Sequence, residues 1–239
     1  YNNEFTTKNW PNPVYQSKQK HDSLKYVLKN GLGVIDTGAH IGDYGLPLAK
    51  ALINLNRGDI IVYCIEPTPS KCEFMENVKT INNLYNVKII CKGLYDKIGT
   101  FSVPNFGMAG TNSGNNTGAW QWIPDKNGLE FTTLDHLYKS KEIGKIGFLW
   151  LDAQWSEEYI LRGAKEYFKS CKPDILMEYW PVSEYHSDGQ TIYLLDNLLK
   201  FLSNFSTTHI RIMKEKMDYH VDKDDIIIQY KRVNNYTNE

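Results

Sequence analysis

The sequence predicts an α/β fold of the Rossmann-like class, with a mostly parallel sheet of seven strands and helices on both faces. Short apolar runs alternate along the chain with segments of helical periodicity, which is the pattern of a parallel sheet wrapped by helices. The run 59–66 (DIIVYCIE) shows no polar alternation, as expected for a strand that is buried on both faces. A glycine-rich turn follows the first apolar run, where sheets of this class bind ligands.

The chain has 239 residues, which suits one α/β domain with a substantial core. Residues 1–20 are polar and aromatic and lead into a predicted helix at 21–29, which Asn30 and Gly31 end. We therefore expect an N-terminal arm and helix over 1–30 and a single domain over 31–239. Because the first residue is Tyr1 and not Met, we also expect the chain to be part of a larger multidomain polypeptide.

The predicted elements follow in a regular order. Strands are expected at 32–36, 59–66, 87–91, 146–152 and 174–178, with two closing strands at 209–213 and 226–230 that pair antiparallel. Helices are expected after the glycine turn, after a capping-box pattern at Ser70 and Glu73, after Ser156, and over 192–202. Residues 99–129 break this order with glycines and polar residues, so a substrate loop is expected over about 102–130.

Composition excludes several classes of function. The 27 basic and 28 acidic residues give a formal net charge of -1, so we expect neither nucleic acid nor an anionic membrane as a partner. No apolar run reaches the roughly 18 residues that a membrane span needs. The four cysteines form no C-x-x-C pair, which indicates reduced thiols in a cytoplasmic protein and no metal site.

The glycine turn carries the first functional signal. Asp36 ends the predicted strand, and Gly38 and Gly42 follow in a D-x-G-x-x-x-G spacing. This spacing differs from the G-x-G-x-x-G of dinucleotide sites, which disfavours a nicotinamide dehydrogenase. The acidic residue suits a cationic part of the ligand, such as the ammonium of a methionine moiety. Glu66, at the end of the next strand, can accept both ribose hydroxyls of an adenosine.

With these residues in view, the chain resembles the FkbM family of S-adenosylmethionine-dependent methyltransferases, which have a class I Rossmann-like fold. The matching segments are Ile35–Gly42, Tyr63–Pro67 with Asn77, Gly93–Gly99, Thr133–Asp135, Phe148–Asp152, Leu161–Ala164 and Pro173–Glu178. They occur in the family's order and cover roughly residues 30 to 180. The combination is specific, although each segment alone is not.

The resemblance implies S-adenosyl-L-methionine as the cofactor and assigns the residues around it. The cofactor-binding residues would be Asp36, Gly38, His40, Gly42, Glu66, Pro67, Leu94, Tyr95, Asp96 and Asp152. Asp152 would lie beside the sulfonium methyl group. Asp152, Glu178 and His186 are the candidates for the general base that a hydroxyl nucleophile needs.

One segment departs from the family pattern. The family usually shows a K-I-D-x-E-G-like segment at the fourth strand, whereas this chain has Trp150-Leu-Asp-Ala-Gln-Trp155. Loss of the Glu puts a carboxylate base or a two-carboxylate metal site at that place in doubt. Aromatic faces stack on sugar rings, so the expected acceptor-binding residues are Trp120, Trp122, Gln154 and Trp155.

The expected reaction is O-methylation of a carbohydrate hydroxyl. A similarity to the methyltransferase domains of large-virus glycan-building proteins implies a deoxysugar such as rhamnose as the acceptor, and the host cytoplasm as the location. The alternatives are a small-molecule (non-sugar) O-methyltransferase, a nucleic-acid methyltransferase, which should carry a basic face, and a cofactor-binding protein without activity.

Overall fold

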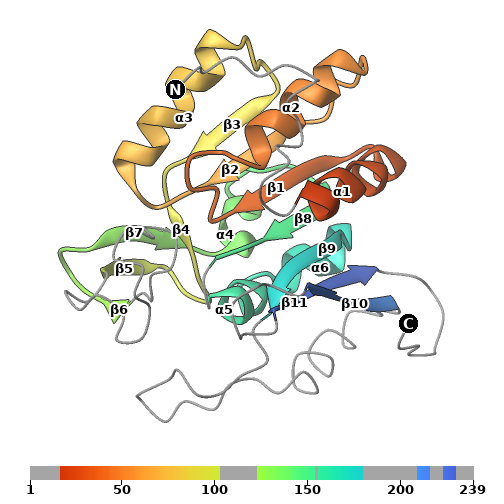
Figure 1. Cartoon of the computed structure of the whole chain (residues 1–239). Helices are drawn as coiled ribbons and strands as arrows, with labels where there is room; N and C mark the ends of the chain where they lie inside the picture. The colour runs from red at the N-terminus through yellow and green to blue at the C-terminus, as the bar shows by residue number, and fades with distance from the viewer. Residues whose placement is uncertain (1–16, 103–122, 154–155, 180–208, 216–222, 230–239) are drawn as a thin grey trace.

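The computed structural model describes residues 17–102, 123–153, 156–179, 209–215 and 223–229 (Figure 1). Its main feature is a seven-stranded sheet in the order β10-β11-β9-β8-β1-β2-β3. The strands in that order are His209–Glu215, Lys223–Gln229, Asp174–Tyr179, Ile146–Leu151, Gly33–Thr37, Val62–Ile65 and Val87–Ile90. The five strands from β9 to β3 run parallel, and β11 runs antiparallel to both β9 and β10. The predicted fold class and the predicted antiparallel closing pair are confirmed.

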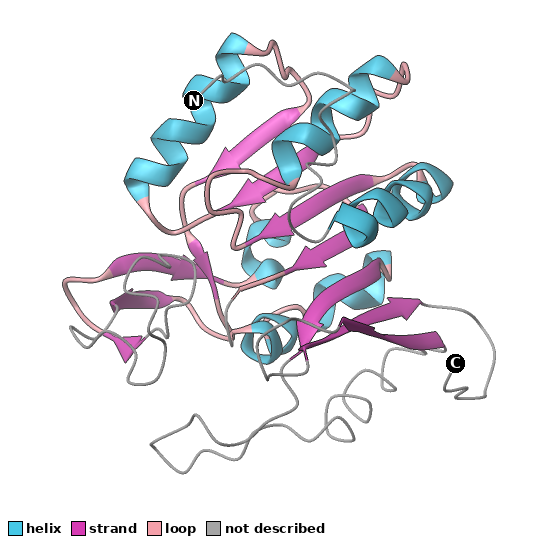
Figure 2. Ribbon diagram, in the orientation of Figure 1, coloured by secondary structure: helices cyan, strands magenta, loops and turns pink. Residues whose placement is uncertain are grey.

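Helices cover both faces of this sheet (Figure 2). One face carries α1 (Ser17–Asn30), α2 (Gly45–Asn54) and α3 (Pro69–Ile81), and the other carries α4 (Leu134–Lys139), α5 (Glu157–Arg162) and α6 (Lys165–Cys171). The helix predicted over 192–202 lies outside the described residues.

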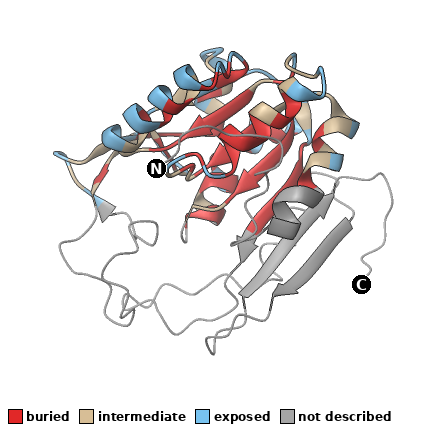
Figure 3. Ribbon diagram, turned by 45° about the horizontal axis from the view of Figure 1, so that its top comes forward, coloured by how far each residue is buried: buried red, intermediate tan, exposed pale blue. Residues whose placement is uncertain are grey.

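Alternation along the buried strands divides the core into two halves. In β1, Val34 packs with the core under α1 to α3, and Ile35 packs with the core under α4 to α6. All four residues of β2 are buried, as the apolar run 59–66 predicted, and so are all six residues of β8 (Figure 3). The sheet is therefore enclosed on both sides, and the edge at the carboxyl ends of its strands is left for a site.

A second, four-stranded sheet projects from one end of the molecule (Figure 1). Its order is β4-β7-β5-β6, with strands Gly93–Leu94, Leu129–Thr132, Gly99–Ser102 and Ile123–Pro124. The expected irregular chain over 99–129 is therefore wrong at both ends. The glycines misled the prediction: a Cβ on Gly128, just before β7, would collide with the backbone of Phe101 in β5, so the close approach of the chain to β5 requires the glycine.

Of the two predicted caps, the capping box is wrong and Ser156 is confirmed in position. The third helix begins at Pro69 with Thr68 as its N-cap, so Ser70 lies inside the helix and forms no capping box. Proline at the first helical position has the φ angle that a helix start needs, so the helix begins earlier in the chain than predicted. Ser156 is the N-cap of α5, but its side chain makes no capping hydrogen bond. In the part of the chain that is described, no helix is long and apolar enough to cross a membrane.

Candidate active site at the carboxyl ends of β1, β2 and β8

The turn between β1 and α2 has an unusual backbone. Gly38, His40 and Gly42 all have positive φ angles, of 65°, 52° and 81°. A Cβ on Gly38 would collide with the carbonyl oxygen of Asp152, and one on Gly42 would press on the side chain of Leu46. The turn thus packs directly against the end of β8 on one side and against α2 on the other.

Asp36 stabilises this turn through a hydrogen bond to the start of α2. Its side chain is buried, and its Oδ2 accepts a hydrogen bond from the backbone N–H of Gly45 at 2.9 Å. In the next position, Thr37 Oγ1 donates to the carbonyl of Trp150 at 3.0 Å, which ties the end of β1 to the end of β8. Asp36 therefore shapes the backbone on which a ligand would rest.

Glu66 is a firmly oriented carboxylate of the site. Only 4% of its surface is exposed. Its Oε2 accepts from the backbone N–H of His40 at 3.1 Å, and its Oε1 accepts from that of Thr68 at 3.0 Å. The Nζ of Lys71 lies 3.8 Å from Oε1. A carboxylate has about four acceptor positions, so hydroxyl donors can still be accepted beside these amides.

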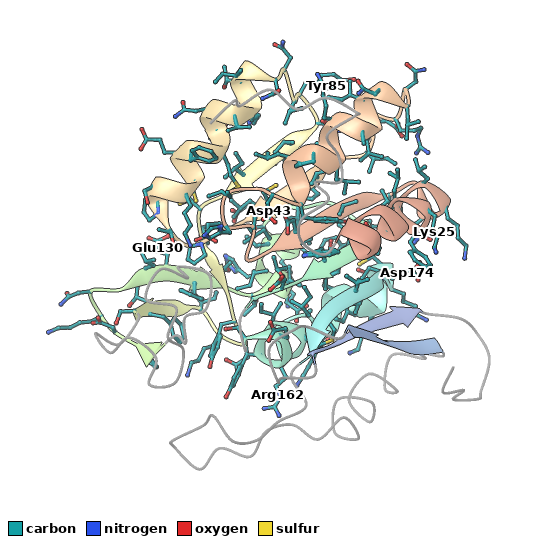
Figure 4. The ribbon with its side chains drawn as sticks, in the orientation of Figure 1. Lys25, Asp43, Tyr85, Glu130, Arg162 and Asp174 are labelled. Atoms are coloured by element: carbon teal, nitrogen blue, oxygen red, sulfur yellow. The ribbon has the colours of Figure 1, made fainter. Side chains whose placement is uncertain are left out.

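His40 interacts with charged groups that follow β1, β2 and β8. Burial lowers the pKa of His40, and Lys71 lowers it further, while the carboxylates of Asp43, Glu66 and Asp152 act in the opposite direction. Burial likewise lowers the pKa of Lys71, with Glu66 opposing. The His40 imidazole is therefore neutral at neutral pH. Figure 4 labels Asp43, which lies in the turn beside the tips of β1 and β2.

Helix α5 contributes a carboxylate beside the end of β8 that the sequence did not indicate. Glu157 is buried, and its Oε1 accepts from the backbone N–H of Ala153 at 2.9 Å. Asp152, the preceding residue, is half-buried and lies next to Gly38 through its carbonyl group. An acidic residue in the first turn of a helix usually faces solvent, so the pattern alone does not reveal this role.

Trp150, which replaces the family's lysine, is a core residue here. It is 4% exposed and stacks on Tyr44, with ring centroids 4.1 Å apart. The hydroxyl groups of Tyr44 and Ser23 are hydrogen-bonded at 3.0 Å, which links this pair to α1. This part of the departure from the family pattern is therefore accommodated by packing.

The segment after β4 joins the small sheet to α5. Leu94 is buried, Asp96 is exposed, and Tyr95 stacks on Tyr159 with ring centroids 4.4 Å apart. A Cβ on Gly163 would collide with the carbonyl of Tyr95, so the end of α5 packs against this segment. Tyr159 was not singled out from the sequence, because a tyrosine in a short helix has no distinctive pattern.

Several expected site residues cannot be placed. Trp120, Trp122, Gln154, Trp155 and His186 lie outside the described residues. Glu178 lies in β9, where its backbone pairs with Asp225 of β11. Within the described ranges, no three His, Cys, Asp or Glu side chains gather where a metal ion could be held.

Comparison with known proteins identifies relatives of the fold. A crystallised FkbM methyltransferase from Methylobacillus flagellatus is 19% identical with a TM-score of 0.50, over 82% of this chain and 43% of that longer chain. An rRNA methylase from Streptococcus thermophilus is 9% identical with a TM-score of 0.50, over 90% of this chain and 95% of that one. At these identities both show a shared fold.

A curated relative matches over a shorter stretch. Ribosomal RNA small subunit methyltransferase G of Treponema denticola is 37% identical over 57 residues, which is 24% of this chain and 22% of the relative. The family described as "Methyltransferase FkbM domain" matches residues 36–221, which is most of the chain. The chain therefore belongs to the FkbM methyltransferase domain family and has a Rossmann-like fold, and it spans less than half the length of the Methylobacillus flagellatus protein and of the Treponema denticola relative.

Proposed function

We propose that this protein transfers a methyl group from S-adenosylmethionine to a hydroxyl of a carbohydrate, such as a deoxysugar like rhamnose in a glycan. The observation that carries the proposal is the convergence of three strand ends. The turn after β1 places the His40 amide on the Glu66 carboxylate of β2, and Gly38 of the same turn packs on Asp152 after β8. This arrangement of two carboxylates at one edge of the sheet supports a ribose-binding role for Glu66 and a role for Asp152 toward the acceptor.

The residues present fit the cofactor. Glu66 is buried and oriented, with acceptor capacity for the ribose hydroxyls. Gly38 and Gly42 let the turn pack closely on Asp152 and Leu46, where a Cβ would collide, so the turn has a defined backbone at the carboxyl end of β1. S-adenosylmethionine supplies an activated methyl group on a sulfonium. We assign to its binding Asp36, Gly38, His40, Gly42, Glu66, Pro67, Leu94, Tyr95, Asp96 and Asp152.

The protein's own contribution is to align the acceptor oxygen and accept its proton. We assign the base to Asp152, because it is half-buried at the end of β8 and interacts electrostatically with His40. His186 and Glu178 are the other candidates. The acceptor would be held by Trp120, Trp122, Gln154 and Trp155, with the substrate segment 102–130 belonging to a single domain over 31–239.

The proposed setting is the cytoplasm. Cys64, Cys72, Cys91 and Cys171 are all free thiols, which favours a reducing compartment. The acceptor is assigned by its chemistry alone: a balanced formal charge of -1 suits a neutral sugar better than a polyanion.

The test is a methyl-transfer assay with labelled S-adenosylmethionine and panels of saccharides and non-sugar alcohols. Asp152→Ala should lower turnover on the order of 100-fold or more, because a general base is worth that much. Affinity for S-adenosylhomocysteine should fall far less than turnover, because Asp152 is assigned to the part of the cofactor that carries the methyl group, and S-adenosylhomocysteine lacks that group. Full activity in this variant would exclude Asp152 as the base.

The panels also separate the alternatives. Methyl transfer to the non-sugar compounds alone would exclude the carbohydrate acceptor. Cofactor binding with no transfer to any acceptor would leave a binding protein without activity.

A further inference from the structure

Thr68 lies beside the Glu66 carboxylate and has a hydroxyl with no assigned role. It is the N-cap of α3, and its backbone N–H donates to Glu66 Oε1 at 3.0 Å. Its Oγ1 is buried, and among the residues that the structure describes it has no hydrogen-bond partner. Burying a hydroxyl without a hydrogen-bond partner lowers the free energy of unfolding, so such an atom usually has a partner or a function.

The usual explanation for a threonine at this position does not apply. An N-cap threonine normally accepts a hydrogen bond from the second or third N–H of its helix through Oγ1. Thr68 makes no such side-chain bond; instead its carbonyl accepts from the N–H groups of Lys71 and Cys72, both at 3.1 Å. The N–H groups of Lys71 and Cys72 are thus satisfied by the backbone, and Oγ1 makes no hydrogen bond to the helix start.

We propose that Thr68 Oγ1 hydrogen-bonds a ribose hydroxyl of the cofactor and forms a diol-reading pair with Glu66. This inference rests on the proposed role of Glu66 as the ribose-binding residue. A ribose hydroxyl that donates to a carboxylate keeps lone pairs that need a donor. Thr68, whose backbone N–H already binds that carboxylate, has a hydroxyl that can supply one, and the amides of His40 and Thr68 hold the carboxylate in place.

The substitution Thr68→Val separates binding from folding. Valine keeps the shape and removes an oxygen that has no partner, so the Tm of the cofactor-free protein should stay the same or rise. The affinity for S-adenosylhomocysteine, measured by calorimetry, should fall about tenfold, as for the loss of one hydrogen bond to a ligand. A merely structural role would lower the Tm of the free protein.

Cofactor analogues make the assignment specific. Wild type should bind 2′-deoxy or 3′-deoxy S-adenosylhomocysteine more weakly than the parent compound. For one of the two analogues this penalty should shrink in Thr68→Val, because the partner of the missing hydroxyl is already gone. An unchanged penalty for both analogues would overturn the inference.

Thr80→Val is the matched control. Thr80 lies on the same helix, about 18 Å away by helical rise, and its exposed hydroxyl donates to the carbonyl of Glu76. The affinity of Thr80→Val for S-adenosylhomocysteine should equal that of wild type. A loss of affinity as large as that of Thr68→Val would overturn the inference.

Glu66→Gln distinguishes a failure of the Thr68 role from a failure of the ribose site at Glu66. If it weakens binding while Thr68→Val does not, the role of Thr68 is wrong and the Glu66 site stands. If Glu66→Gln leaves binding unchanged, the proposed ribose site itself is wrong.

Discussion

The carboxyl ends of β2 and β8 each carry a carboxylate, and the two are held in different ways. At β2, both oxygens of Glu66 accept from backbone amides, so the side chain itself is fixed. At β8, the buried contacts fix the backbone around Asp152: Gly38 packs on its carbonyl, and Glu157 holds the next amide. This difference fits the roles proposed for the two residues, with Glu66 binding the cofactor and Asp152 acting as the base.

The largest effect should come from the residue that lies between the two ends. Gly38→Ala places a side chain at a φ of 65° and against the carbonyl of Asp152. The left-handed conformation costs roughly 1–2 kcal/mol, and the collision adds to it. We expect both a lower free energy of unfolding, measured with urea, and loss of cofactor binding.

Gly31→Ala is the control for backbone strain alone. Gly31 has a φ of 63°, but its Cβ would meet only the end of the Arg57 side chain, at 3.3 Å. It should lose stability by about 1–2 kcal/mol and keep cofactor affinity. Equal losses of affinity in both variants would show that the contact between Gly38 and Asp152 is unimportant.

The next effect should be confined to the β2 end. Glu66→Gln removes the charge and turns an NH₂ group toward a backbone N–H, because only one amide oxygen can accept. We expect affinity for S-adenosylhomocysteine to fall roughly 10- to 100-fold, as for hydrogen bonds to a charged group. Glu76→Gln, an exposed residue of α3 paired with Lys79, should have no such effect.

These two ends also show what the sequence could and could not predict. Glu66 and Gly38 were identified because strand ends and glycine turns leave a pattern in the chain. Glu157 was missed, since the burial of a first-turn acidic residue depends on where α5 packs. The small sheet was missed because its strands are only two to four residues long, too short to show alternation.

A smaller effect is expected at the β8 end. Glu157→Ala removes the acceptor of the Ala153 N–H and should lower kcat about tenfold through misplacement of Asp152, with cofactor affinity largely kept. Glu157→Gln, whose amide oxygen can still accept, should recover most of the activity. Glu166→Gln is the control, because Glu166 is an exposed first-turn glutamate of α6. If Glu157→Gln is as poor as Glu157→Ala, the charge and not the hydrogen bond matters.

The smallest effect should be a pH dependence that arises from His40, which interacts with both Glu66 at the β2 end and Asp152 at the β8 end. Burial holds the pKa of His40 below its ordinary value of about 6.5. Between that value and the lower folded-state pKa, the unfolded chain binds more protons, so stability should fall as the pH drops through this window.

Protonation of His40 also places a positive charge near a cationic cofactor, so affinity for the cofactor should fall on acidification. The loss should be larger for S-adenosylmethionine than for S-adenosylhomocysteine, because only the former carries the sulfonium charge. In His40→Asn the pH dependence of both affinities should flatten, and an undiminished difference between the two ligands would exclude His40 as its origin.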